Sequence, residues 1–213
     1  MRFANREEAG VKLAKRLWSF RGTDAIVLAL PRGGAIVGAI AARELGLPLG
    51  LALVCKMGYP GKPECAAGAV AEQGIVVYDA VAIEPLPSSW RHMAEKRARH
   101  ILRSRRQMYY GDSNLQPEVK GRTVLLVDDG MATGLCMDAA VLWAREQGAS
   151  RVVVAVPVAS PESAQRLAAS ADKVIIVDNP MQFGSAVGAH YDYFPQIVDE
   201  EVQTALQEVC YGI

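Results

Sequence analysis

The amino-acid sequence predicts an α/β fold with a mainly parallel, five-stranded sheet flanked by helices. Short runs of Val, Ile and Leu alternate with segments of helical periodicity, the pattern of strands joined by crossover helices. Of the 213 residues, 51% are hydrophobic and 22% charged, so the chain can bury one full core. We therefore expect a single domain over residues 1–213, with a core at about 20–180 and a small hood from about 181–213. The N-terminal segment could contribute to the hood.

The first third of the chain contains strands, helices and one irregular segment. Asn5 can cap a helix whose apolar face includes Ala9 and Leu13. The run DAIVLAL (24–30) predicts a buried strand, which the break PRGG separates from a helix, AIVGAIAAREL, ending at Gly46. Further strands are expected at 48–54 and 74–81. The segment between them, 55–68, contains three glycines and two prolines, so we expect a mobile loop there.

The remainder alternates more regularly. A basic helix is predicted at 88–111, and its arginines are spread around the axis, which favours a solvated or interface helix over a nucleic-acid-binding stripe. Strands and helices then follow in the order strand 124–127, helix 138–148, strand 151–158, helix 161–171, strand 173–180 and a short final helix.

Composition excludes several classes of protein. The 23 basic residues balance 23 acidic ones, so there is no net basic charge for nucleic acid. No apolar run approaches the roughly 20 residues of a membrane span. The N-terminal stretch is charged rather than patterned as a signal peptide, and the four cysteines show no C-x-x-C spacing. We expect a cytoplasmic protein with reduced thiols and no membrane partner.

The segment VLLVDDGMATG (124–134) is the main candidate for a functional site. Asp128 and Asp129 follow a buried strand and precede a turn of small residues that leads into a helix. The backbone N–H groups from Ala132 to Leu135 would form an anion site at the start of this helix, while the carboxylates can accept hydrogen bonds from sugar hydroxyls. Together these groups suit ribose 5-phosphate. Because open α/β sheets bind ligands at the carboxyl ends of their strands, PRGG lies at an equivalent place.

Other interpretations of the acidic pair lack their accompanying motifs. The sequence contains no G-x-x-x-x-G-K-[ST], which argues against a P-loop, and no G-x-G-x-x-G opens the first strand-helix unit. A receiver-like domain with a phosphoacceptor aspartate is disfavoured by the small-residue, glycine-flanked loop that follows the acids.

The sequence resembles the type I phosphoribosyltransferases. VLLVDDGMATG is similar to their signature for phosphoribosyl pyrophosphate (PRPP): four hydrophobic residues, two acids and a phosphate loop. LALPRGG falls at the family's pyrophosphate loop, and VCKMGYPGKPE at its flexible catalytic loop. The resemblance runs from Phe3 to the tail and is nearest to bacterial phosphoribosyltransferase-like proteins of unassigned substrate.

This resemblance implies the type I fold and a Mg²⁺-dependent transferase of nucleotide metabolism. Such an enzyme would transfer the phosphoribosyl group of PRPP to a nitrogenous base or amine and release pyrophosphate. It also implies a homodimer and a cis peptide bond at Pro31–Arg32.

The resemblance further assigns residues to roles. Lys56 and Arg32 would be catalytic, and Pro31, Arg32, Gly33 and Gly34 would bind pyrophosphate. PRPP would be bound by Asp128, Asp129, Gly130, Met131, Ala132, Thr133, Gly134, Leu135 and Cys136. The metal would be held by Asp128 and Asp129, with Asp192 as a further candidate, and the base would contact Phe183 and Tyr191.

Three positions depart from the family pattern. Cys55 stands where an arginine commonly precedes the loop lysine, and Cys136 where a Ser or Thr hydroxyl usually binds phosphate. A hydrogen bond to a charged group contributes about 1.5–3 kcal/mol, so these changes would weaken PRPP affinity by tens to hundreds of fold. Ala132 replaces a candidate general base. The alternative function is therefore a non-catalytic regulator that binds PRPP or a nucleotide, and the sequence does not name the acceptor.

Overall fold

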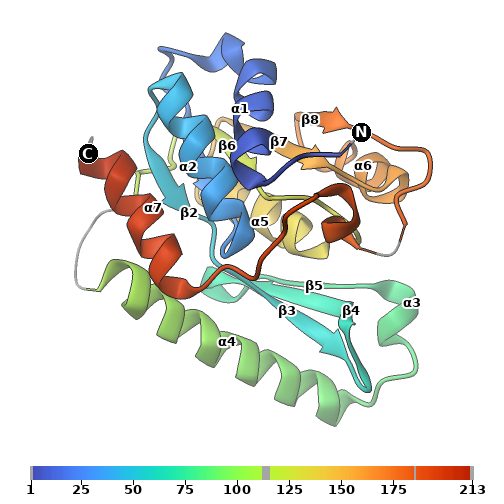
Figure 1. Cartoon of the computed structure of the whole chain (residues 1–213). Helices are drawn as coiled ribbons and strands as arrows, with labels where there is room; N and C mark the ends of the chain where they lie inside the picture. The colour runs from blue at the N-terminus through green and yellow to red at the C-terminus, as the bar shows by residue number, and fades with distance from the viewer. Residues whose placement is uncertain (1, 112–115, 185, 212–213) are drawn as a thin grey trace.

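The computed structural model describes residues 2–111, 116–184 and 186–211. Its main sheet has five parallel strands in the order β2-β1-β6-β7-β8 (Figure 1). The bounds of these strands are β1 Ile26–Ala29, β2 Leu49–Leu51, β6 Thr123–Val127, β7 Arg151–Val158 and β8 Lys173–Asp178. The predicted parallel α/β architecture is confirmed.

Helices cover both faces of this sheet, which is why its strands are apolar throughout. On one face, Val27 and Leu125 pack with α1 (Arg6–Arg16) and α2 (Gly33–Leu45). On the other face, the alternate residues Ile26 and Leu126 pack with α5 (Leu135–Glu146). α6 (Pro161–Leu167) connects β7 to β8.

Helix boundaries follow the predicted signals closely. The Asn5 side chain accepts a hydrogen bond from the Glu8 N–H at 2.9 Å and so caps α1. Gly46, at φ 64°, ends α2 in the left-handed region that glycine favours. α5 begins at Leu135 rather than Asp138, directly behind Gly134, so the phosphate loop leads straight into the first turn of the helix.

The segment 55–68 is not the irregular loop that its composition predicts. β3 (Val54–Tyr59) and β4 (Lys62–Ala71) form an antiparallel hairpin, and β5 (Val76–Tyr78) completes a second, three-stranded sheet. The turn contains Gly61 at φ 75°, while Gly68 sits where a Cβ would lie 2.6 Å from the Met57 side chain. Glycine here provides a turn and close packing inside regular structure, which composition alone does not distinguish from a loop.

The long helix α4 (Ser88–Tyr110) lies along this second sheet (Figure 1). Its apolar residues Ala98 and Leu102 join the core cluster that contains Cys55 and Met57. β5 is shorter than the predicted strand because the chain turns into α3 (Ala80–Ile83), which Asp79 caps.

The tail, where the hood is predicted, divides into two parts. Its first part joins the N-terminus: Phe3 and Tyr191 form a parallel bridge, and the N–H of Asp192 donates to the Phe3 carbonyl at 2.8 Å. We call residues 2–5 and 187–195 the clasp. The last helix, α7 (Asp199–Tyr211), leaves this region and packs on α2 and β2 (Figure 1). Within the described ranges, no helix is long and apolar enough to cross a membrane.

Candidate functional site

The acidic pair and the pyrophosphate loop meet at the carboxyl edge of the main sheet. Asp128 and Asp129 follow β6, and β1, which leads into PRGG, is the adjacent strand. A Cβ added to Gly33 would lie 1.9 Å from Asp129 Oδ2, and one added to Gly34 would lie 2.8 Å from Asp128 Cα. The loop backbone therefore touches both acids, and glycine is required for this approach.

Burial makes the acidic pair electrostatically unusual. Burial first, and the neighbouring charge of Asp129 second, raise the pKa of Asp128 well above its ordinary value. Burial also raises the pKa of Asp129, although the Arg6 guanidinium opposes this rise. The Asp128 carboxylate accepts a hydrogen bond from the Asp129 N–H at 2.8 Å, but no ion pair joins it to a Lys or Arg of the described chain. A cation arriving at Asp128 would favour the ionised carboxylate, which the site otherwise disfavours.

Arg6 is a member of this site that the sequence analysis missed. Its Nε donates to Asp129 Oδ2 at 2.8 Å, across 123 residues of sequence. The signal that could have revealed it is a charged residue on the apolar face of α1, in register with Ala9 and Leu13. An arginine placed there must find a buried partner.

The phosphate loop is braced from outside by β7 and α6. Ser160 Oγ donates to the Ala132 carbonyl at 2.8 Å, and Arg166 donates to the Thr133 carbonyl. Arg166 also forms an ion pair with Asp138 at 2.7 Å, which ties α6 to the first turn of α5. These contacts hold the loop carbonyls on the outer side.

The same bracing leaves the amides of the loop available to a ligand. In the part of the chain that the structure describes, the N–H groups of Ala132, Thr133, Gly134 and Leu135 donate to no protein acceptor. Gly134, at φ 71°, turns the chain into α5. These amides could therefore bind an anion at the start of the helix, where the sequence predicts an anion site.

The remaining predicted pyrophosphate and loop residues lie around these groups. Arg32 is half-buried at the start of α2, and the Pro31–Arg32 peptide bond is cis, as the resemblance implies. Lys56 is exposed on β3, and the hairpin packs against α5. Burial and the charge of Asp128 raise the pKa of the Cys136 thiol to about 12, against the opposing charge of Lys56. Cys136 is thus a neutral thiol rather than a nucleophile at physiological pH.

One tail assignment is wrong, and two stay predictions. Asp192 is 63% exposed and pairs with Arg2 at 3.1 Å, and no three metal-ligating side chains gather within the described residues, so its contact with a metal stays a prediction. The Tyr191 side chain is in the core, 1% exposed, and its hydroxyl donates to the Asp129 carbonyl at 2.6 Å. Its ring is therefore unavailable to a base. Phe183 is also buried, but it borders a hollow of about 480 Å³ beside Ala132.

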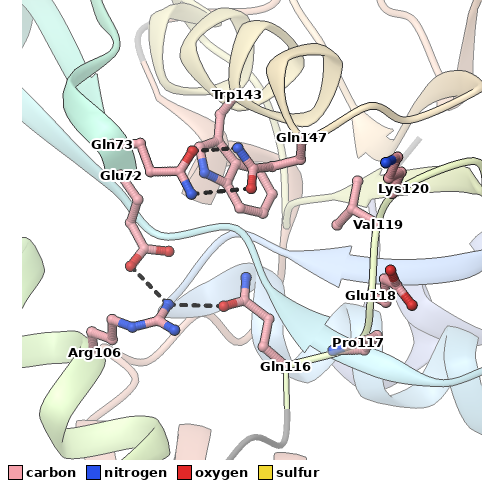
Figure 2. Close-up of a pocket in the computed structure, with 10 residues that line it drawn as sticks. All are labelled: Glu72, Gln73, Arg106, Gln116, Pro117, Glu118, Val119, Lys120, Trp143 and Gln147. Carbon is pink, nitrogen blue, oxygen red and sulfur yellow. Dashed lines mark hydrogen bonds and ion pairs between the residues drawn. The ribbon is translucent and has the colours of Figure 1, made fainter.

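A second hollow, of about 560 Å³, lies away from these residues (Figure 2). Trp143 and Gln147, on its wall, come from the end of α5, and Trp143 is about 12 Å along the helix from the phosphate loop, at ~1.5 Å rise per residue. Its polar groups largely pair with one another, as Glu72 does with Arg106 at 3.0 Å (Figure 2). This hollow is not part of the candidate site.

The fold and site together define a class of protein. A parallel sheet that brings an acidic pair, an amide-lined loop and a glycine loop to one edge has the groups that suit a phosphorylated sugar or nucleotide. The chain belongs to the phosphoribosyl transferase domain family, whose model matches residues 5–193.

Individual proteins and one solved structure are also similar to this chain. The chain is 38% identical over 202 residues to a Mycobacterium tuberculosis protein named as a phosphoribosyl transferase without a stated substrate, covering 94% of this chain and 45% of the relative. It thus spans about half the length of the curated relatives it matches. A 69-residue stretch, 32% of the chain, is 42% identical to ribose-phosphate pyrophosphokinase of Mycobacterium leprae, covering 21% of that protein. The crystal structure of TT1426 from Thermus thermophilus matches at 43% identity and a TM-score of 0.78, over 98% of this chain and 99% of that one.

Proposed function

We propose that this protein binds PRPP and Mg²⁺ and transfers the phosphoribosyl group to a nitrogenous base or amine, releasing pyrophosphate. The observation that carries the proposal is the contact between the acidic pair and the pyrophosphate loop. A Cβ at Gly33 would lie 1.9 Å from Asp129 Oδ2, so a ligand seated there would meet the carboxylates, the glycine amides and the phosphate loop together. These are the groups that a ribose carrying phosphates at both ends requires.

The acidic pair also fits Mg²⁺. This ion prefers oxygen ligands and is commonly held by one or two carboxylates together with substrate phosphates and water. Asp128 and Asp129 would hold it. Asp128 forms no ion pair with another described residue, and Arg6 acts on it only as a nearby charge. When bound, the metal would supply positive charge to the oxygens of the leaving pyrophosphate.

The side chains and amides of the chain would do the rest by orientation and charge. Asp128 and Asp129 would accept hydrogen bonds from the ribose hydroxyls, and the amides of the phosphate loop would hold the 5-phosphate. Arg32 and Lys56 would meet the negative charge that develops on pyrophosphate as its bond to C1 breaks. The nucleophile is the acceptor nitrogen, so no side-chain nucleophile is needed, in keeping with the protonated Cys136.

The hollow beside Ala132 and Phe183 gives the acceptor a place next to the phosphate loop. A homodimer also belongs to the proposal, and sedimentation velocity would test it. To identify the acceptor, a panel of bases and amines would be assayed for release of pyrophosphate from PRPP. PRPP binding without release for any acceptor would instead support the regulatory function.

Asp128→Asn is the sharpest test of PRPP binding. Asp128 is half-buried, its pKa is raised, and it has no partner in an ion pair with the described residues, so its neutral form costs the fold little. We expect the variant to keep the thermal midpoint of the wild type but to lose PRPP affinity by at least about tenfold in calorimetry, because a charged hydrogen bond is lost. Glu146→Gln, an exposed charge at the other end of α5, is the control and should change neither quantity. Unchanged PRPP affinity in Asp128→Asn would refute the assignment.

A further inference from the structure

Arg6 is a buried arginine next to the proposed ribose site. Only 6% of it is exposed, although it is the first residue of α1. Arginine is almost never buried unless its charge and its hydrogen-bond donors are matched, because removing the charge from water is costly. Its surroundings therefore explain its position.

The guanidinium of Arg6 has three distinct contacts. Nε donates to Asp129 Oδ2 at 2.8 Å, and a terminal nitrogen donates to the Pro195 carbonyl at 2.8 Å. The plane lies over the Phe194 ring, with Cζ 3.7 Å from the ring centre. One side chain thus joins α1, the clasp and the acidic pair.

Asp129 is held at both its side chain and its backbone. Arg6 holds the carboxylate, while the Tyr191 hydroxyl donates to the carbonyl of the same residue at 2.6 Å. Both holding groups come from parts of the chain outside the phosphate-loop motif. The carboxylate has little freedom to rotate, and its side chain is 14% exposed.

The pyrophosphate loop is shaped around this pair. A Cβ at Gly33 would lie 1.9 Å from Asp129 Oδ2 and 3.1 Å from Arg6 Nε. Any other residue at position 33 would push into the ion pair, so the pair forms part of the wall of the site rather than a contact behind it.

We propose that Arg6 is a positioning residue that holds the Asp129 carboxylate in the orientation that receives the ribose hydroxyls. The inference rests on the proposed function, because it assumes that Asp129 binds ribose. Preorganised groups favour binding because the ligand does not have to order them. Arg6 would therefore matter more for ligands that contain ribose than for pyrophosphate alone, which meets Asp129 only through the metal.

The test compares two ligands on the same variants. Mg²⁺ with PRPP and Mg²⁺ with inorganic pyrophosphate are titrated by calorimetry into the full chain, as wild type, as Arg6→Met and as Arg16→Met. Arg16 is an exposed arginine of the same helix and serves as the control. For Arg6→Met we expect PRPP affinity to fall by roughly 10- to 100-fold, as for a lost charged hydrogen bond, and pyrophosphate affinity to fall by a clearly smaller factor, because pyrophosphate lacks the ribose hydroxyls.

A purely structural role would lower both affinities together. An unchanged ratio of the two affinities therefore overturns the inference, while PRPP binding by the wild type would still uphold the PRPP site of the proposed function. Tighter PRPP binding by Arg6→Met would also overturn it, since Arg6 would then be a competitor for Asp129. Absence of PRPP binding in the wild type overturns both the inference and the proposed function.

A second variant serves if Arg6→Met does not fold. Arg6→Lys keeps a charge but cannot contact Asp129 and Pro195 as a fork, so the ratio of PRPP affinity to pyrophosphate affinity should change in the same direction. In an Asp129→Asn background, Arg6→Met should change PRPP affinity by less than about threefold, because the two residues act as a unit.

Discussion

Gly33 and Gly34 have no side chains, yet their backbones determine how closely the pyrophosphate loop approaches the acidic pair. The atoms that an added Cβ would contact differ between the two positions. A Cβ at Gly33 would meet the end of the Asp129 side chain, whereas one at Gly34 would meet backbone atoms, Asp128 Cα at 2.8 Å and the Val127 carbonyl at 2.9 Å. Side-chain ends can move, but the backbone of a buried strand cannot do so cheaply.

Alanine substitutions at these glycines should therefore separate binding from stability. Gly34→Ala should lower the free energy of unfolding by about 1–3 kcal/mol through overpacking, measured by urea denaturation. Gly33→Ala should displace the Asp129 carboxylate from Arg6 and so lower PRPP affinity more than Gly34→Ala does. Equal losses of PRPP affinity in both variants would contradict this geometry.

Individual site residues differed in how far the sequence could predict them. Asp128, Asp129 and the phosphate loop follow one another along the chain, so their motif and its place after a strand are local signals. Arg6 reaches its partner across 123 residues, and nothing local to Asp129 announces it. Tyr191 was assigned wrongly because an aromatic residue near a ligand site has the same sequence signal whether its ring faces the ligand or the core.

The hairpin formed by β3 and β4 is the element that the sequence predicted least well. Its glycines and prolines suggested a loop, but the strands are built on alternation: Cys55 and Met57 are buried, and Lys56 between them is exposed. Small side chains then allow α5 to pack closely against β4. The exposed Lys56 is left on the face that the proposed function requires, while its neighbours anchor the strand in the core.

Hydrogen exchange should reveal two levels of stability within this hairpin. Amides in the part of β4 that pairs with β5, around Gly68 to Val70, should exchange slowly without ligand because they lie inside a three-stranded sheet. The turn at residues 59–62 should exchange fast, and it should slow when Mg²⁺ and PRPP bind if the hairpin closes over the ligand. Equal exchange of the turn with and without ligand would argue against closure. Rapid exchange throughout β4 would instead support the mobile loop that the sequence predicts for residues 55–68.

At the scale of the whole molecule, the parallel sheet was predictable because each of its strands carries its own apolar run and is followed by a helix or a glycine break. The second sheet and the clasp were not, since they depend on partners that local patterns do not identify. Phe3 bridges Tyr191 near the opposite end of the described chain, and β4 is a strand only through its pairing with β3 and β5. Other contacts between elements use carboxylates, and these respond to pH.

Asp172 is the clearest example of a pH-dependent contact. Its carboxylate accepts from the Val152 N–H at 2.7 Å and from Arg145 at 3.0 Å, joining the segment before β8 to β7 and α5. These bonds lower the pKa of Asp172, with the backbone N–H as the main cause and Arg145 as a lesser one. A carboxyl group whose pKa is lower in the folded state stabilises the fold above its unfolded pKa, and this contribution is lost as pH falls through the folded pKa.

We expect Asp172→Asn to lower the free energy of unfolding at pH 7 by about 1 kcal/mol or less, because the carboxylate is 36% exposed and partly screened by solvent. The deficit should shrink as pH falls below 4 and disappear once the wild-type carboxyl is protonated, since asparagine can still accept from the Val152 N–H. Urea denaturation of both proteins from pH 3 to 7 measures this difference. In an Arg145→Met background the effect at pH 7 should be smaller, because the two residues share one interaction. A deficit that stays constant over the whole pH range would show that Asp172 acts through packing rather than through its charge.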